Sequence, residues 1–217
     1  MLRGKVGSIF LRGFTLAEVL ITLGIIGVVA AMTMPTLITN IQERLNITAL
    51  RTFYSTLSKA TAIIVAEHDE PSSWGLRNND AAISNEVFER YSEILRVQKV
   101  CVENDSSCFP FPIKSYVTGN PVITESQYRS WALKSFIMQN GMTVFIDVNN
   151  NCYSVFVDVN GFKKPNTFGI DVFALMINGK GRIVSFDDES IPNDGGNDNI
   201  EYNYAFRLID NNWKKDY

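Results

Sequence analysis

The stretch "RGFTLAEVLITLGIIGVVAAMTMP", Arg12 to Pro35, decides how this chain is organised. From Phe14 to Met34 it is apolar or small apart from Glu18, and it reaches the ~20 residues that a transmembrane helix needs. An acid at the centre of such a helix costs ~2.5 to 3.5 kcal/mol on insertion scales and usually has a function. The stretch therefore predicts a membrane span and makes Glu18 a candidate functional residue.

The residues around this run predict the orientation of the span. Arg3, Lys5 and Arg12 precede it and no acid does, which by the positive-inside rule places the N-terminus in the cytoplasm. A secretory signal peptide would have a shorter apolar region followed by a small-residue cleavage site. "MTMPTLITNIQERL" follows instead, so we expect the rest of the chain to stay attached to the span and to lie outside.

Two interpretations of Glu18 are open at this stage. In one, Glu18 lies near the cytoplasmic end of the span and extends its carboxylate to the interface. In the other, the carboxylate pairs with a cation, which removes the cost more completely. A cut between Gly13 and Phe14 would create an α-amino group four residues from Glu18, and such an amine can pair with an acid.

The residues on either side of this bond resemble a known signature. A short basic leader ends in Gly13, and Phe14, Thr15, Leu16 and Glu18 open an apolar helix. This arrangement resembles the N-terminus of type IV prepilins and type II secretion pseudopilins. The close resemblance covers only about the first 25 residues.

The resemblance implies specific processing and roles. A prepilin peptidase would remove residues 1–13, cutting the bond between Gly13 and Phe14, and would methylate the new amino group of Phe14. Glu18 would neutralise the N-terminus of a neighbouring subunit during assembly. Pro35 falls where many pilins have a proline that bends the helix.

Beyond Pro35, apolar residues recur at steps of three and four, which is typical of an amphipathic helix. We therefore expect one long helix to about Glu67, with a membrane and assembly part over 14–34 and an amphipathic part over 35–67. A coiled-coil stalk is one use for the apolar face. Packing on the globular domain expected over 68–217 is the other, and the strand-rich sequence that follows favours it.

The globular part predicts two further helices, over 85–98 and 124–141. Thr124 and Gln127 form a capping box for the second helix, and Gly141 is its expected C-terminal stop. Four strands are predicted over 142–148, 152–159, 171–177 and 182–186. The expected fold class is α+β and pilin-like, with the long N-terminal helix packed on a small antiparallel sheet.

The chain has three cysteines, an odd number for an exported domain. Cys101 and Cys108 enclose only six residues, "VENDSS", so a disulfide between them is the favoured pairing. A pair that uses Cys152 is the alternative, and geometry decides between them.

A segment late in the sheet carries possible cation ligands. "DVNGFKKPNTFGID" places oxygens at Asp158, Asn160 and Asp171, the kind of ligand that calcium takes from loops. Some secretion pseudopilins carry calcium in a C-terminal loop. The bidentate Glu of an EF-hand is missing and two lysines oppose a cation, so a polar turn between strands is the competing interpretation.

Composition argues against several function classes. The net charge is -3 and no basic cluster occurs, so nucleic acid is an improbable main partner. His68 is the single histidine, which excludes zinc catalysis on two histidines. No GxSxG elbow or phosphate-binding loop occurs either. We therefore expect a protein that is not an enzyme and that needs no cofactor, calcium excepted.

The expected function is that of a pseudopilin or minor pilin in a type II secretion or type IV pilus-like filament. Its implied partners are a prepilin peptidase, other pilin or pseudopilin subunits, an inner-membrane platform protein and an assembly ATPase. The implied location is the bacterial cytoplasmic membrane and then the filament. The alternative is a permanently anchored single-pass domain that binds a ligand outside the cell and never polymerises.

Overall fold

The computed structural model describes residues 13–78, 80–189 and 200–217. The chain divides into two compact units, Met1–Gln42 and Glu43–Tyr217. The predicted leader, residues 1–13, lies outside the described residues except for Gly13.

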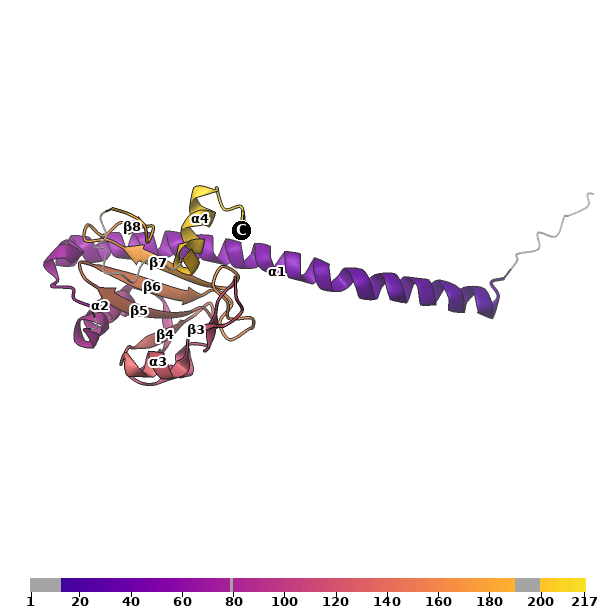
Figure 1. The fold of residues 1–217 in the computed structure, drawn as a ribbon, viewed down its shortest axis with the longest axis horizontal. Coiled ribbons are helices and arrows are strands. Elements are labelled where there is room, and N and C mark those ends of the chain that lie inside the picture. The colour runs from indigo at the N-terminus through magenta and orange to yellow at the C-terminus, as the bar shows by residue number, and fades with distance from the viewer. Residues whose placement is uncertain (1–12, 79, 190–199) are drawn as a thin grey trace, which may run out of the picture. The chain divides into compact units, whose positions relative to one another are not determined.

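Helix α1, Leu16–His68, is the long helix that the sequence predicts, and it continues through Pro35 (Figure 1). In the first unit its large apolar side chains are exposed. In the second unit one face is buried, at steps of three and four residues. The buried residues are Asn46, Leu50, Phe53, Leu57, Ala60, Thr61 and Ile64.

The second unit contains a six-stranded antiparallel sheet in the order β1-β4-β5-β6-β7-β8. Its strands are β1 (Val97–Cys101), β4 (Ser135–Met138), β5 (Thr143–Asn149), β6 (Cys152–Asp158), β7 (Val172–Ile177) and β8 (Ile183–Val184). Two short strands, β2 (Ile113–Lys114) and β3 (Pro121–Ile123), form a separate pair. The α+β class is confirmed, with two strands more in the main sheet than the sequence predicts.

Both faces of the central strands are covered, since every residue of β6 and β7 is buried. On one face, the hydroxyl of Tyr153 in β6 lies 2.8 Å from that of Tyr91, which lies 2.5 Å from Thr61 Oγ1 of α1. On the other face, Phe156 stacks on Phe145 with ring centroids 4.5 Å apart. The α1 face buried in this unit therefore packs on the sheet, and no coiled coil is needed to cover it.

Helix α2, Ala81–Ile94, supplies Tyr91 and lies four residues earlier than the predicted helix over 85–98. The side chain of Asp80 accepts from the backbone N–H of Ile83 and caps the helix. The residues from Val97 onward form the edge strand β1 instead. The predicted C-terminal boundary was therefore wrong.

The predicted helix over 124–141 was also wrong beyond its first turns. Helix α3 covers only Glu125–Ser130, with the expected capping box between Thr124 and Gln127. Ala132 then adopts φ +53°, a left-handed conformation that ends the helix. Strand β4 follows, and Gly141, at φ +87°, lies in the turn to β5. A short C-terminal helix, α4 (Tyr204–Asp210), completes the unit.

Candidate functional site

The N-terminal end of α1 is built around Thr15 and Glu18. The Glu18 carboxylate accepts from the backbone N–H and from the hydroxyl of Thr15, both at 2.8 Å. The Thr15 hydroxyl in turn accepts from the backbone N–H of Glu18 at 3.2 Å. These contacts form a capping box, which satisfies donors that the first helical turn leaves free. Sequence reasoning gave Glu18 a role but did not recognise Thr15 as its local partner.

The bond between Gly13 and Phe14 lies immediately before this capped turn. Both residues are exposed and outside the helix, and the Phe14 side chain is 89% exposed. A Cβ on Gly13 would meet no atom within 4 Å. Nothing in the described part of the chain therefore requires glycine at this position, and the bond is accessible to an enzyme.

The part of α1 that follows is long and apolar enough to cross a membrane, and none of its most apolar window is buried in the structure. Its threonines bond back to the helix, for example Thr33 Oγ1 to the carbonyl of Val29 at 3.0 Å. An apolar surface of this extent needs lipid or protein to cover it. The bend predicted at Pro35 stays a prediction.

Comparison with known proteins assigns this region. A family model described as the prokaryotic N-terminal methylation motif matches residues 12–34. This region is the type IV prepilin-like signal. The signal and the apolar helix together support a pilin-like or pseudopilin-like precursor that is anchored in the membrane by a single span. No match was found among curated proteins or among solved structures.

The prepilin-like signal contains every residue predicted for processing and pairing. Gly13, Phe14 and Glu18 lie within the matched range. Gly13 and Phe14 directly precede α1, and Glu18 lies in its first turn. A precursor with this signal implies a prepilin peptidase and other pilin subunits as partners. It also points to a structural subunit, a class of protein that is typically not enzymatic.

The predicted oxygen ligands come together in the second unit, between the end of β6 and the start of β7. Asp158 and Asp171 are both fully buried, and the Asn160 amide donates to Asp171 at 3.0 Å. Gly161 turns the chain with φ +69°, and a Cβ there would collide with the Gly141 carbonyl.

Several oxygens of this cluster have no hydrogen-bond partner among the described residues. They are Oδ2 of Asp158, Oδ1 of Asn160 and Oδ1 of Asn166. Asn166 was not among the predicted ligands, although it lies in the same turn-rich segment. Burial, together with the neighbouring charge of Asp171, raises the pKa of Asp158 to about 9. Burial also raises the pKa of Asp171. The cluster is therefore rich in acceptors and poor in cationic charge.

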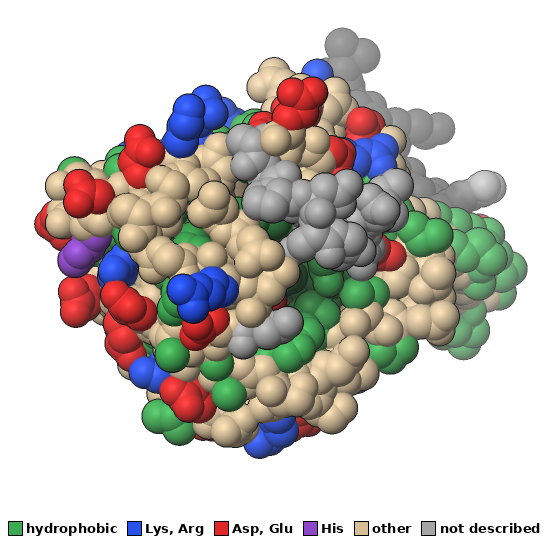
Figure 2. Space-filling view, turned by 60° about the vertical axis from the view of Figure 1, so that its left-hand side comes forward, with side chains coloured by type: hydrophobic (Ala, Val, Ile, Leu, Met, Phe, Trp, Pro, Cys, Tyr) green, Lys and Arg blue, Asp and Glu red, His purple; other side chains and the backbone are tan. Residues whose placement is uncertain are grey.

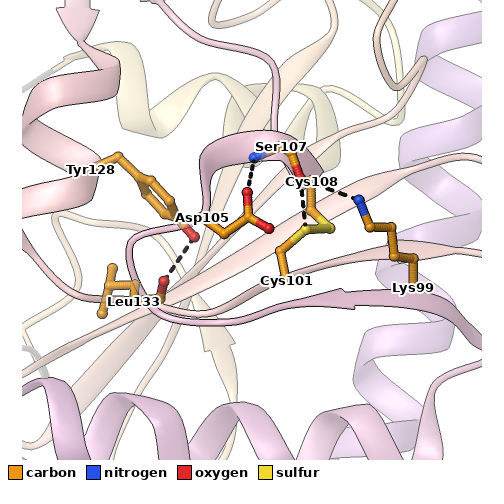
Figure 3. Close-up of a disulfide and its surroundings, with 7 residues drawn as sticks. All are labelled: Lys99, Cys101, Asp105, Ser107, Cys108, Tyr128 and Leu133. Atoms are coloured by element: carbon orange, nitrogen blue, oxygen red, sulfur yellow. Dashed lines mark hydrogen bonds between the residues drawn. A yellow bond between two sulfur atoms is a disulfide. The ribbon is translucent and has the colours of Figure 1, made fainter.

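Two of the three cysteines lie at the edge of the sheet: Cys101 ends the edge strand β1, and Cys108 lies in the turn that follows it. Cys101 and Cys108 are joined by a disulfide, with their Cα atoms 5.8 Å apart (Figure 3). Within the enclosed loop, Asp105 accepts from the Ser107 backbone at 2.9 Å, and that bond chiefly lowers the Asp105 pKa. Cys152 is buried and free of a disulfide. A structural disulfide fits an oxidising compartment.

Replacing Cys101 and Cys108 together with serine is expected to lower the free energy of unfolding by about 2.5 kcal/mol, from the loop-closure entropy of a short loop. Denaturant unfolding of the detergent-solubilised protein measures the loss. Cys152→Ala is the control for cysteine loss, because it releases no loop and adds no buried hydroxyl. Equal stability of the double variant and the wild type under non-reducing conditions would contradict a structural role.

Charged side chains of both signs lie on the surface of the described part of the chain. On the face drawn in Figure 2, acidic and basic side chains are interspersed and the basic ones form no continuous patch. Some are paired, as Arg90 is with Glu86 at 2.7 Å and Lys134 with Glu89 at 2.6 Å. Nucleic-acid binding usually needs a basic stripe.

Proposed function

We propose that the chain is the precursor of a pilin or pseudopilin subunit that assembles into a filament through the apolar part of α1. The observation that carries the proposal is a prepilin-like signal on a long helix whose apolar side chains are exposed. Filament assembly covers these side chains with the same part of neighbouring helices. The globular unit does not depend on this part of α1 for its own core.

Processing comes first in this scheme. A prepilin peptidase hydrolyses the peptide bond between Gly13 and Phe14, and the new amine of Phe14 becomes N-methylated. A methylated secondary amine still carries a positive charge at neutral pH. Its addition to a neighbouring subunit places a cation beside the Glu18 carboxylate in an environment of low dielectric, where the pair is stronger than in water.

The remaining partners and the orientation follow the same proposal. The N-terminus faces the cytoplasm and Glu43–Tyr217 lies outside. A platform protein in the inner membrane and a cytoplasmic ATPase drive extraction of the helix from lipid.

Intact mass and N-terminal peptide mapping of the protein from its native membrane fraction test the first step. The expected result is a chain that begins at Phe14 with one added methyl group. A chain that keeps its leader would contradict the proposal and would favour a permanently anchored binding domain.

We further propose that the Asp158 and Asp171 cluster binds calcium. The residues present fit a hard cation, because buried carboxylate and amide oxygens without partners are the ligands that calcium prefers. Among the described residues no group of three His, Cys, Asp or Glu lies close enough for a metal, so amide oxygens must complete the site. Asn160 and Asn166 supply them. Bound calcium would favour the ionised form of Asp158.

Asp158→Asn is expected to abolish stabilisation by calcium. At about 100 times its Kd, calcium should stabilise the wild type by about 2.7 kcal/mol. Thermal unfolding at pH 8 with calcium, with magnesium and with chelator measures the difference, and Asp210→Asn, an exposed acid, is the control. An undiminished calcium shift in Asp158→Asn would contradict the site.

The same variant has a predictable pH dependence without calcium. Folded Asp158 keeps its proton up to a pKa of about 9, and the ordinary pKa of an aspartate in an unfolded chain is 3.8. Between these values the folded state binds more protons than the unfolded state, so stability falls as pH rises. Asp158→Asn should lose this component of the pH dependence, and thermal midpoints from pH 5 to 8 would show it.

A further inference from the structure

A cavity of about 450 Å³ lies beside β5, and its lining contains no residue of the Asp158 and Asp171 cluster. Its walls come from the start of α2, from the segment that follows α3 and from β5. The lining includes Ala81, Ser84, Trp131, Ala132, Leu133 and Asp147. The volume is in the range of small-ligand sites. No part of the proposed assembly mechanism uses this cavity.

Asp147 is the one charged residue in the lining. Among the described residues its carboxylate has no ion pair and no side-chain hydrogen-bond donor. The charged groups named on the neighbouring segments are bonded elsewhere: Lys134 to Glu89 at 2.6 Å, and Asp80 to the N-terminus of α2. Burial raises the pKa of Asp147 to about 6. A carboxylate in this position is costly unless something neutralises it.

The walls of the cavity select the shape of a ligand. Trp131 is half-buried and contributes an aromatic wall next to the acid. The Ser84 hydroxyl already accepts from the backbone N–H of Val148 at 3.2 Å. An anion would meet the Asp147 charge, and a neutral ligand would leave that charge uncompensated. A cation with a short apolar stem can interact with both groups, because the indole ring of Trp131 and the carboxylate of Asp147 both attract cations.

We propose that this cavity binds an ammonium or guanidinium group, with Asp147 as its counter-ion and Trp131 as its aromatic wall. The group belongs either to a free organic cation or to a lysine or arginine side chain of a second copy of the chain. The proposal stands independently of filament assembly, since it rests on the second unit alone.

The test uses the full chain in detergent micelles with ethylguanidinium as the probe and N-ethylurea as its uncharged match. Tryptophan fluorescence and the thermal midpoint report binding. We expect ethylguanidinium to bind with a millimolar Kd, at least tenfold more tightly than N-ethylurea. Asp147→Asn should weaken it at least tenfold, and Trp131→Phe should remove the fluorescence response. The matched control is Glu93→Gln, an exposed acid of α2.

Two results would overturn the proposal. One is equal binding of the charged and uncharged probes. The other is unchanged ethylguanidinium binding in Asp147→Asn, which the isosteric replacement makes a clean comparison.

Sedimentation equilibrium in the same detergent then measures self-association, which distinguishes a side chain of a second copy from a free organic cation. Self-association that Asp147→Asn weakens tenfold, and that ethylguanidinium competes away, identifies a side chain of a second copy. Self-association that neither change affects, or no self-association, excludes a second copy and leaves a free organic cation as the source. Both assignments presuppose that the probe binds at Asp147.

Discussion

Gly13→Arg is expected to leave the chain unprocessed in cells that contain a prepilin peptidase. Gly13 makes no contact that a side chain would break, and it lies outside α1. The variant should therefore fold and insert normally. A large side chain beside the scissile bond misplaces that bond in the enzyme, and a displacement of this kind can lower the rate by about 100-fold. Pulse labelling with resolution of precursor and mature forms measures the loss.

Gly27→Ala is the matched control for this experiment. Gly27 also lies within the matched signal, and a Cβ added there would also meet no atom within 4 Å. Alanine is a better helix former than glycine by about 1 kcal/mol, so α1 should tolerate the change and processing should continue. Cleavage of Gly13→Arg at the wild-type rate would exclude the bond after Gly13 as the processing site.

Glu18→Ala is expected to leave processing within about twofold of the wild type but to lower incorporation into filaments by about 100-fold or more. Removing one partner of a buried ion pair costs about 3–5 kcal/mol, and each 1.4 kcal/mol is about tenfold in an equilibrium. A second effect acts in the same direction. Without the acid, the helix is also more stable in lipid, by at most the ~2.5 to 3.5 kcal/mol that an acid costs at the centre of a span. The subunit is then held in the membrane, and sheared-filament yields measure the result.

The Thr15 contacts allow charge to be separated from helix capping. Glu18→Gln keeps a side chain that a capping box accepts but removes the charge, so it should fail in assembly as Glu18→Ala does. Thr15→Ala removes both hydroxyl contacts and keeps the charge, so assembly should be largely retained. Glu67→Ala, an exposed acid at the other end of α1, controls for loss of an acid. Normal assembly of Glu18→Gln would refute charge pairing.

Local sequence chemistry determined the N-terminal part of this protein. One continuous stretch of sequence contains the apolar run, Glu18 and the basic residues before Gly13. The membrane span and the signal can therefore be predicted without knowing any distant contact. The same holds for the periodicity of α1 after Pro35 and for the capping box at Thr124. In each case the deciding interactions lie within one helical turn or one apolar segment.

Tertiary contacts overrode local pattern between residues 124 and 141. The apolar spacing there fits a helix, but residues 135–138 gain more as β4, paired with β1 on one side and β5 on the other. Strand pairing of this kind depends on residues outside the segment, so the periodicity within the segment cannot predict it. The same reason explains why the helix predicted over 85–98 extended into residues that form the start of β1.

The two candidate ligand sites also differ in how much of each the sequence could predict. The sequence alone predicted Asp158, Asn160 and Asp171 as possible cation ligands, because oxygen-bearing residues cluster within one turn-rich segment. Only the tertiary structure shows that three of the cluster's oxygens are buried without partners. Asp147 gave no signal in the sequence at all, since an acid in an alternating strand is ordinarily a solvent-facing residue. Asp147 is half-buried, and it lines one cavity with Trp131 because α2 and the segment after α3 pack against β5. Local sequence does not encode that packing.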